Sequence, residues 1–132
     1  MEAIVSEFIL ADDDFLVSQT DEKGVIIFAN DDFCRVAGYT LEELIGKPHN
    51  IVRHKDMPRA AFKDLWNTVK SNKVWNGYVK NAIKGNNGYY WVYASVYPKY
   101  DSVTKRQTYI SCRRKASTKE IEDAQKLYKT MQ

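Results

Sequence analysis

Segments with the character of β-strands stand towards the two ends of the chain, and helical segments fill the part between them. Apolar, β-branched runs at residues 15–19 and 25–29 flank turn residues 21–24, a pattern typical of a hairpin. Three more strand-like runs follow late in the chain, at residues 75–83, 89–97 and 107–114. Strands and helices segregated in this way indicate an α+β fold rather than an alternating α/β one.

The helical segments carry recognisable start signals. Thr40 and Glu43 fit a capping box, in which two side chains satisfy free N–H groups of the first turn. Pro58 opens a longer helix whose apolar residues recur at helical spacing, namely Phe62, Leu65, Trp66 and Val69. A second capping box, at Ser117 and Glu120, begins a terminal helix with one apolar stripe, made by Ile121, Ala124, Tyr128 and Met131.

These elements predict one domain of the α+β class, because 132 residues provide a single core and little more. We expect one antiparallel, five-stranded sheet, with short helices over one face and a cavity between sheet and helices. An apolar group followed by an acidic trio predicts a short N-terminal cap helix in residues 1–14. The domain then covers residues 15–116, and residues 117–132 form a C-terminal helix or connector. Pro98 is expected to end its strand.

Charge is spread along the chain. The formal net charge is +3, and groups such as Arg113, Arg114 and Lys115 fit an ordinary solvated surface. Nucleic-acid binding is not expected, because it needs a denser basic stripe. Cys34 and Cys112 lie in apolar patterns without CxxC spacing, which favours buried thiols in a reducing compartment.

No apolar run approaches the roughly 18 residues that cross a bilayer, and the start of the chain lacks the pattern of a signal peptide. The sequence therefore predicts a cytoplasmic domain without direct membrane insertion. A longer parent or partner receptor could hold such a domain at the inner membrane.

Residues 48–58 form the most unusual stretch, because they place His49, Arg53, His54 and Asp56 in a short bend between helices. A metal site is not expected, since the chain has only two His and no thiolate nearby. Nucleophilic catalysis is not expected either, because no Ser or Cys is paired with these His in a recognisable pattern. The plain alternative is that Asp56 and Asn50 cap helix ends while Arg53 and His54 lie on the surface.

A planar ligand is the other interpretation of this stretch and its surroundings. Arg53 and His54 can donate hydrogen bonds to a phosphate or to a carbonyl-rich ring edge. Trp66 and Trp75 can provide flat apolar walls, and the amide of Asn81 can pair with ring heteroatoms. For the two Trp residues, ordinary core packing remains the alternative.

Several motifs resemble those of the PAS family. The general PAS opening is matched by Thr20-Asp21, by residues 29–33 and by residues 38–46. The stretch 48–54, together with Asp56-Met57-Pro58 and residues 60–62, is similar to the narrower aerotaxis-receptor branch of that family. So are Trp66, Trp75-Asn76-Gly77, Val79-Lys80-Asn81 and Tyr90-Trp91-Val92. The match runs from about Ser18 to the end of the last strand.

This resemblance implies a non-enzymatic sensor that binds FAD without a covalent link and reports redox state or oxygen in aerotaxis. It implies a chemoreceptor or another signalling domain as the partner, with a homodimer as a further possibility. The implied site or near-site residues are Asn30, Arg53, His54, Asp56, Trp66, Trp75 and Asn81. Lys55 departs from the family motif, which usually has Pro there, so the bend in this chain is expected to be more flexible.

Two alternatives stay open at this point, a ligand-free module and a haem domain, whereas a light-sensing flavin domain with a cysteine adduct is not expected. A ligand-free module would use the aromatic interior as core and would serve protein–protein interaction. Haem would need an axial His in the cavity, for which His49 or His54 could serve. A light-sensing flavin domain needs a Cys on the helix near the ring, and Cys34-Arg35 falls on the first short helix instead.

Overall fold

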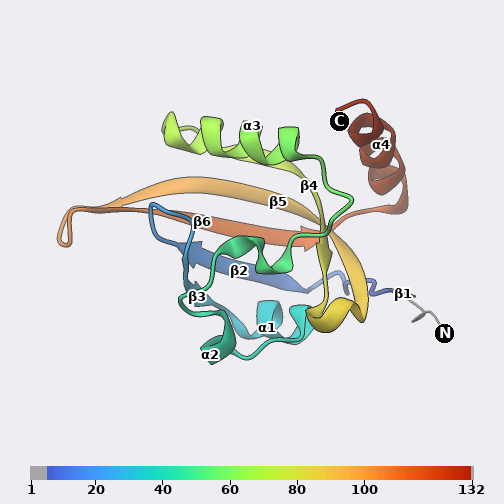
Figure 1. Cartoon of the computed structure of the whole chain (residues 1–132), viewed down its shortest axis with the longest axis horizontal. Helices are drawn as coiled ribbons and strands as arrows, with labels where there is room; N and C mark the ends of the chain where they lie inside the picture. The colour runs from blue at the N-terminus through green and yellow to red at the C-terminus, as the bar shows by residue number, and fades with distance from the viewer. Residues whose placement is uncertain (1–5, 132) are drawn as a thin grey trace.

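A computed structural model describes residues 6–131 of the chain. This part contains one six-stranded sheet with α-helices and short 3-10 helices (η) around it (Figure 1). In chain order the elements are β1 (Ser6–Glu7), β2 (Phe15–Thr20), β3 (Ile26–Ala29), α1 (Asp31–Ala37), α2 (Leu41–Leu44), η1 (His49–Val52), α3 (Arg59–Lys70), β4 (Trp75–Ala82), η2 (Lys84–Asn86), β5 (Gly88–Asp101), β6 (Arg106–Lys115) and α4 (Thr118–Lys129).

The sheet is mixed rather than purely antiparallel. Strands β2 to β6 form the expected five-stranded antiparallel array, in the order β4-β5-β6-β2-β3. The short strand β1 is an addition, and it pairs in parallel with the start of β5. Strand β6 pairs with β5 only from Val92 onwards, so residues Gly88 and Tyr89 have a free side on which β1 can bind.

The expectation of an N-terminal cap helix is wrong for the described residues 6–14. Ser6–Glu7 is a strand, and the residues up to Asp14 contain no helix. The backbone N–H of Phe8 donates to the carbonyl of Tyr89 at 2.8 Å, which extends the contact with β5. The unpaired backbone groups of β5 favour a strand here, because buried N–H and C=O groups need partners. Residues 1–5 of the predicted cap lie outside the described part. The division into cap, domain and connector stays a prediction.

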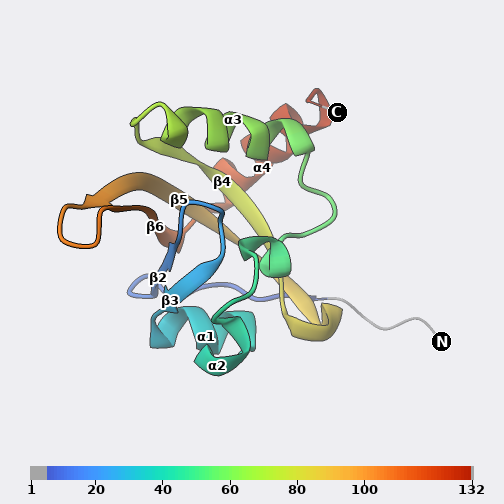
Figure 2. The ribbon, with the colours of Figure 1, turned by 60° about the vertical axis from the view of Figure 1, so that its left-hand side comes forward.

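The two faces of the sheet are covered by different helices. The inner face packs against the segment from α1 to α3, and this contact buries a core that includes Leu16, Phe33, Leu44, Val52 and Val92. Both views place α1 and α2 on one side of the molecule and α3 on the opposite side, with η1 between them (Figure 1, Figure 2). Helix α4 packs on the outer face, where the ring of Tyr128 stacks on Trp91.

The predicted start signals of the helices are confirmed. Thr40 with Glu43 and Ser117 with Glu120 each form a complete capping box. Helix α3 begins directly after Pro58, and its apolar residues face the core as expected. Within residues 6–131, no helix is both long enough and apolar enough to span a membrane.

Pro98 does not end its strand, because β5 continues to Asp101. Strand β4 accompanies β5 only as far as Val96, whereas β6 pairs with it to the end. Beyond Val96, therefore, β5 has a neighbour on one side and an open edge on the other. A proline is tolerated in such a stretch because its missing N–H can face the open edge.

Candidate functional site

An open cavity of about 250 Å³ lies between the inner face of the sheet and the segments η1 and α3. Its walls come from β2, β4, β5 and β6, from the turn before β3, and from η1 and α3. None of the residues that line it is acidic, whereas Lys23, Arg53 and Arg113 are basic. The cavity therefore suits a ligand with acceptor groups or negative charge.

Arg113 is the most unusual group in this cavity, because it is a buried cation with only 6% of its surface exposed. Its Nε donates to Ser111 Oγ at 2.8 Å, and its guanidinium lies 5.9 Å from the centre of the Phe33 ring. It forms no ion pair with a carboxylate among the described residues. Burial consequently lowers the pKa of Arg113. A buried cation without a counter-ion is costly, which favours an electron-rich ligand beside it.

The amide of Asn81 connects this cation to the wall formed by η1. In the orientation that satisfies both neighbours, its nitrogen donates to the Val52 carbonyl at 3.1 Å and its oxygen accepts from Arg113 Nη1 at 2.9 Å. Asn81 is 2% exposed and stands opposite Tyr90 on β5. The Tyr90 hydroxyl is buried without a hydrogen-bond partner among the described residues, and burial raises its pKa to about 12. The network is thus polar, buried and incompletely satisfied.

His49 adds a neutral imidazole to the same cavity. Its Nε2 shares a hydrogen bond of 2.8 Å with Ser18 Oγ, and its ring meets the buried Phe33 ring edge-on. Burial lowers the pKa of His49 to about 3, with the positive charge of Arg113 as the second cause. The residue keeps some exposed surface, but its ring lies between buried groups, so burial is the main influence. The imidazole can therefore donate or accept a hydrogen bond without carrying charge near neutral pH.

Aromatic rings form one wall of the cavity. Trp66 and Phe62 reach it from α3, and Tyr109 reaches it from β6. The rings of Trp66 and Tyr109 meet edge-on, with centroids 5.4 Å apart. Such flat apolar surfaces suit a planar ring system.

Three of the seven residues predicted for the site line this cavity, namely Arg53, Trp66 and Asn81. Arg53 stands at the end of η1, and its guanidinium carbon lies 4.1 Å from the centre of the Phe62 ring. The backbone of Arg53 also pairs with Asn81 of β4, so the sheet fixes its position. The structure therefore brings together the cation, the ring and the amide that the sequence singled out.

His54 and Asp56 lie outside the cavity, on the other side of β4. The backbone N–H of His54 donates to the Lys80 carbonyl at 3.4 Å, and Lys80 Nζ binds Asp56 Oδ2 at 2.9 Å. This contact lowers the pKa of Asp56. The backbone N–H of Asp56 also donates to His54 Nδ1 at 3.0 Å. The two residues thus fasten the bend to β4 and support the cavity wall from outside.

Trp75 does not line the cavity either, although it lies on the inner side under α3. Its indole Nε1 donates to Asp64 Oδ2 at 2.9 Å, and it is 8% exposed. Its ring covers Gly77 so closely that an added Cβ there would lie 2.5 Å from the Trp75 ring. Core packing, the plain alternative from the sequence, describes this residue in the structure.

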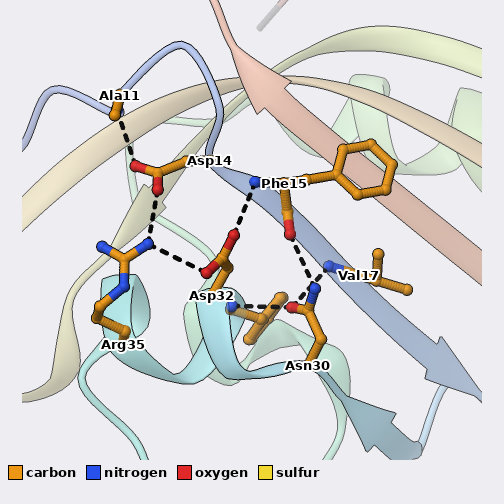
Figure 3. A network of polar contacts seen from close by, with 8 residues as sticks. Ala11, Asp14, Phe15, Val17, Asn30, Asp32 and Arg35 are labelled. Carbon is orange, nitrogen blue, oxygen red and sulfur yellow. Dashed lines mark hydrogen bonds and ion pairs between the residues drawn. The ribbon is translucent and has the colours of Figure 1, made fainter.

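Asn30 is an N-cap residue in the structure. Its Oδ1 accepts from the backbone N–H groups of Phe33 and Val17, each at 3.0 Å, and its amide donates to the Phe15 carbonyl at 2.8 Å. Figure 3 shows this amide between the backbones of β2 and α1, beside the contacts that join Arg35 to Asp14 and Asp32. Asn30 is not among the residues that line the cavity. It positions α1, on which the cavity neighbour Phe33 stands.

Arg113 is the main residue that sequence reasoning missed. We expected it on a solvated surface with Arg114 and Lys115, and the structure shows this to be wrong. The signal was available, because strict alternation places Arg113 on the same face of β6 as Tyr109 and Ser111. That face is the inner one, since all three line the cavity. A run of basic residues in a strand therefore has to be divided between two faces.

The donor set fits an aromatic, heteroatom-rich group such as a flavin ring. Buried donors at Arg113 and Asn81 can meet carbonyl and nitrogen atoms of a ring edge, and the aromatic wall can meet its face. No group of three or more His, Cys, Asp or Glu among the described residues is arranged to hold a metal ion.

Comparisons with known proteins agree with this geometry. A family model described as the PAS fold matches residues 26–112. The chain is 48% identical over 122 residues to the aerotaxis receptor of Escherichia coli K12, and 28% identical over 101 residues to a nitrogen fixation regulatory protein of Klebsiella oxytoca. These matches cover 92% and 76% of this chain but only 24% and 20% of the relatives, so the chain spans about a quarter of their length or less.

Solved structures show the same fold at low sequence identity. A light-oxygen-voltage (LOV) domain described together with a flavin analogue aligns with a TM-score of 0.72 and 15% identity, covering 89% of this chain and 88% of that one. The LOV domain of the blue-light photoreceptor Aureochrome1, in its dark structure, aligns with a TM-score of 0.69 and 19% identity, covering 87% and 82%. The chain therefore belongs to the PAS family, and within that family it is of the aerotaxis-receptor branch.

Proposed function

We propose that the chain binds FAD non-covalently in the cavity and works as a redox or oxygen sensor that signals to a chemoreceptor or another signalling partner. The observation that carries this proposal is the buried Arg113, which has no carboxylate partner among residues 6–131, in a cavity with an aromatic wall and a buried amide. The similarity to the aerotaxis receptor supports a role in signalling, and we propose no enzymatic activity for the chain.

The bound flavin would supply the electron chemistry, and the protein would hold and tune it. Arg113 and Asn81 would hold the polar edge of the ring system, while Trp66 and Phe62 would lie beside its flat surface. Arg53 would lie near the part of the ligand that leaves the cavity. No covalent link is proposed, because the cavity lining contains no cysteine and Cys34 lies on α1 outside it.

The charge of the cavity supports redox sensing. A fixed cation interacts more favourably with a ligand that has gained negative charge, and the lining provides no carboxylate to offset this effect. Arg113 therefore favours the reduced ligand whenever reduction leaves it more negative. His49 can act as a neutral hydrogen-bond partner without altering this charge balance.

Strand β4 provides a route for the signal. The Asn81 amide holds Val52 on one side and Arg113 on the other, so a ligand that prefers a different amide orientation must disturb both contacts. Further along β4, the Tyr78 hydroxyl binds Glu120 of α4, and Tyr128 of α4 binds the Tyr78 carbonyl. We propose that the outer face with α4 conveys the change to the partner, which includes the possibility of a second copy of the chain.

Two alternatives from the sequence remain distinct outcomes of the test. A haem protein would have to use His49, because His54 does not line the cavity. A ligand-free interaction module would leave the buried Arg113 without a ligand. We also propose the cytoplasmic location that the sequence predicts, next to a membrane only through a parent or partner receptor.

The test is the visible spectrum of freshly purified protein before and after anaerobic reduction with dithionite. We expect two flavin bands that bleach on reduction, and FAD in the supernatant after denaturation. A single intense Soret band would replace the flavin by haem. A colourless protein that takes up no added FAD, FMN or riboflavin would reject the proposal in favour of the interaction module.

A further inference from the structure

The cavity is too small to enclose a whole dinucleotide. Its volume of about 250 Å³ lies below the roughly 300–1,000 Å³ of pockets that bury drug-sized ligands. A bound ring system would therefore fill it, and the chain that carries the phosphate would have to leave through the opening. The residues at the opening consequently decide whether a phosphorylated ligand is preferred.

Lys23 belongs to the cavity lining and is exposed to solvent, which places it at the opening, on a turn held by hydrogen bonds. Its backbone N–H donates to Asp21 Oδ1 at 2.8 Å, and the same oxygen accepts from Val25 at 3.0 Å. The next residue, Gly24, has a φ of +84°, and its carbonyl accepts from the backbone N–H of His49 at 3.0 Å. A Cβ on Gly24 would lie 3.0 Å from the Trp66 ring, so the turn approaches the aromatic wall closely. The backbone of Lys23 is thus held in place beside the cavity.

Lys23 is also free to bind an anion. It lines the cavity together with Arg53, and neither forms an ion pair with a carboxylate among the described residues. The carboxylate of Asp21 is occupied by the backbone of its own turn. Glu22 is the opposing charge nearby, since it is the second cause, after burial, of the raised pKa of Tyr109 in the lining.

We propose that Lys23 binds the phosphate of the ligand at the mouth of the cavity and so makes the chain prefer FMN and FAD over riboflavin. This inference rests on the flavin-binding function proposed above. An ammonium group on a fixed turn suits this role, because it is a point charge that can follow a phosphate over several positions.

The test compares the dissociation constants of riboflavin, FMN and FAD by fluorescence quenching, using the chain after removal of any bound flavin. In Lys23→Gln, we expect the affinity for FMN and FAD to fall about fivefold, the upper end for an exposed ion pair, while that for riboflavin stays unchanged. Glu22→Gln should shift the preference in the opposite direction. Lys126→Gln, an exposed lysine on α4, is the matched control and should leave all three constants unchanged.

The outcomes distinguish a failure of the proposed role of Lys23 from a failure of the proposed flavin binding. If the unaltered chain binds riboflavin as tightly as FMN and FAD, or if Lys23→Gln keeps the original preference, the role of Lys23 is refuted while flavin binding stands. If the unaltered chain binds none of the three flavins, both proposals fall. Loss of the preference at high salt would support the role, because screening weakens an exposed ion pair.

Discussion

The polar groups on the two faces of strand β4 differ in whether their charge is paired. On the inner face, Asn81 is buried and bonded to Val52 and Arg113, and the cation behind it has no counter-ion among the described residues. On the outer face, Lys80 pairs with Asp56, whose side chain is 59% exposed. The inner face therefore carries an unsatisfied charge that a ligand can complete, whereas the outer face carries an ordinary ion pair that fastens a bend.

Replacing the inner cation should give the largest effect. In Arg113→Met, we expect flavin affinity to fall by about 10- to 150-fold, because hydrogen bonds from a charged group contribute about 1.5–3 kcal/mol. The free energy of unfolding without ligand should change little, because the removal of a buried cation that has no carboxylate partner among the described residues offsets the loss of the donor to Asn81 and Ser111. Titration with FAD and urea unfolding of the same variant check the two halves of this prediction. A large loss of stability with unchanged affinity would make Arg113 a structural residue and remove the contrast between the faces.

Removing the inner amide should mainly lower stability. In Asn81→Leu, the Val52 carbonyl and the Arg113 guanidinium each lose a buried partner, which should cost about 1–3 kcal/mol. Lys80→Met, on the neighbouring position of the same strand, should cost less than about 1 kcal/mol, because it removes a partly exposed ion pair. Urea unfolding at neutral pH compares them. Equal losses in the two variants would show that the faces do not differ in the way described.

On the inner face, His49 should make the free energy of unfolding depend on pH. The pKa of His49 is about 3 when folded and near 6.5 when unfolded, so below pH 6.5 the unfolded chain binds a proton that the folded chain does not. Stability should therefore fall as the pH decreases from about 6.5 towards 3, by at most about 2 kcal/mol at pH 5. In His49→Gln this part of the decrease should disappear. Unfolding without ligand at pH 7 and pH 5 measures it, and an identical decrease in the variant would contradict the burial of a neutral imidazole.

The smallest effect on the free energy of unfolding is expected from replacing Asp56 on the outer face. The contact with Lys80 lowers the pKa of Asp56, so its contribution is present above the ordinary pKa of 3.8 and is lost as the pH falls through the lower folded value. Asp56→Asn should cost well under 1 kcal/mol at neutral pH, because the carboxylate is largely exposed and screened by solvent and salt. Unfolding at low and high salt should show the loss shrinking as salt is added. A loss above about 2 kcal/mol would place Asp56 among the essential groups of the site.

The sequence predicted the elements well wherever the signal is local. The capping boxes at Thr40 and Ser117, the helix after Pro58 and the five antiparallel strands depend on neighbouring residues, and the structure confirms them. The cap helix, as far as the described residues 6–14 test it, the strand end at Pro98 and the purely antiparallel sheet were wrong. In all three cases the outcome depends on which side of β5 is free, and that depends on residues far away in the chain.

The candidate site was predicted in part for the same reason. Residues 48–58 were recognised as one motif, but the chain crosses β4 within it, so that Arg53 lines the cavity and His54 does not. Arg113 was missed although its alternation with Ser111 was visible, because a charged residue beside two others resembles a surface run. Only the pairing of β6 between β5 and β2 shows that this face is covered. Flavin binding by the seven predicted residues stays a prediction.

The adjacency of Asn81 and Lys80 on β4 has a consequence for how such a chain can change in length. Deleting one residue inside Trp75–Ala82 would move every residue on one side of the deletion to the opposite face of the sheet. The ammonium group of Lys80 would then point into the cavity. The tip of the β5–β6 hairpin, at residues 102–105, is exposed and lies outside the cavity lining. Insertions and deletions should therefore accumulate at this tip while β4 keeps a constant length.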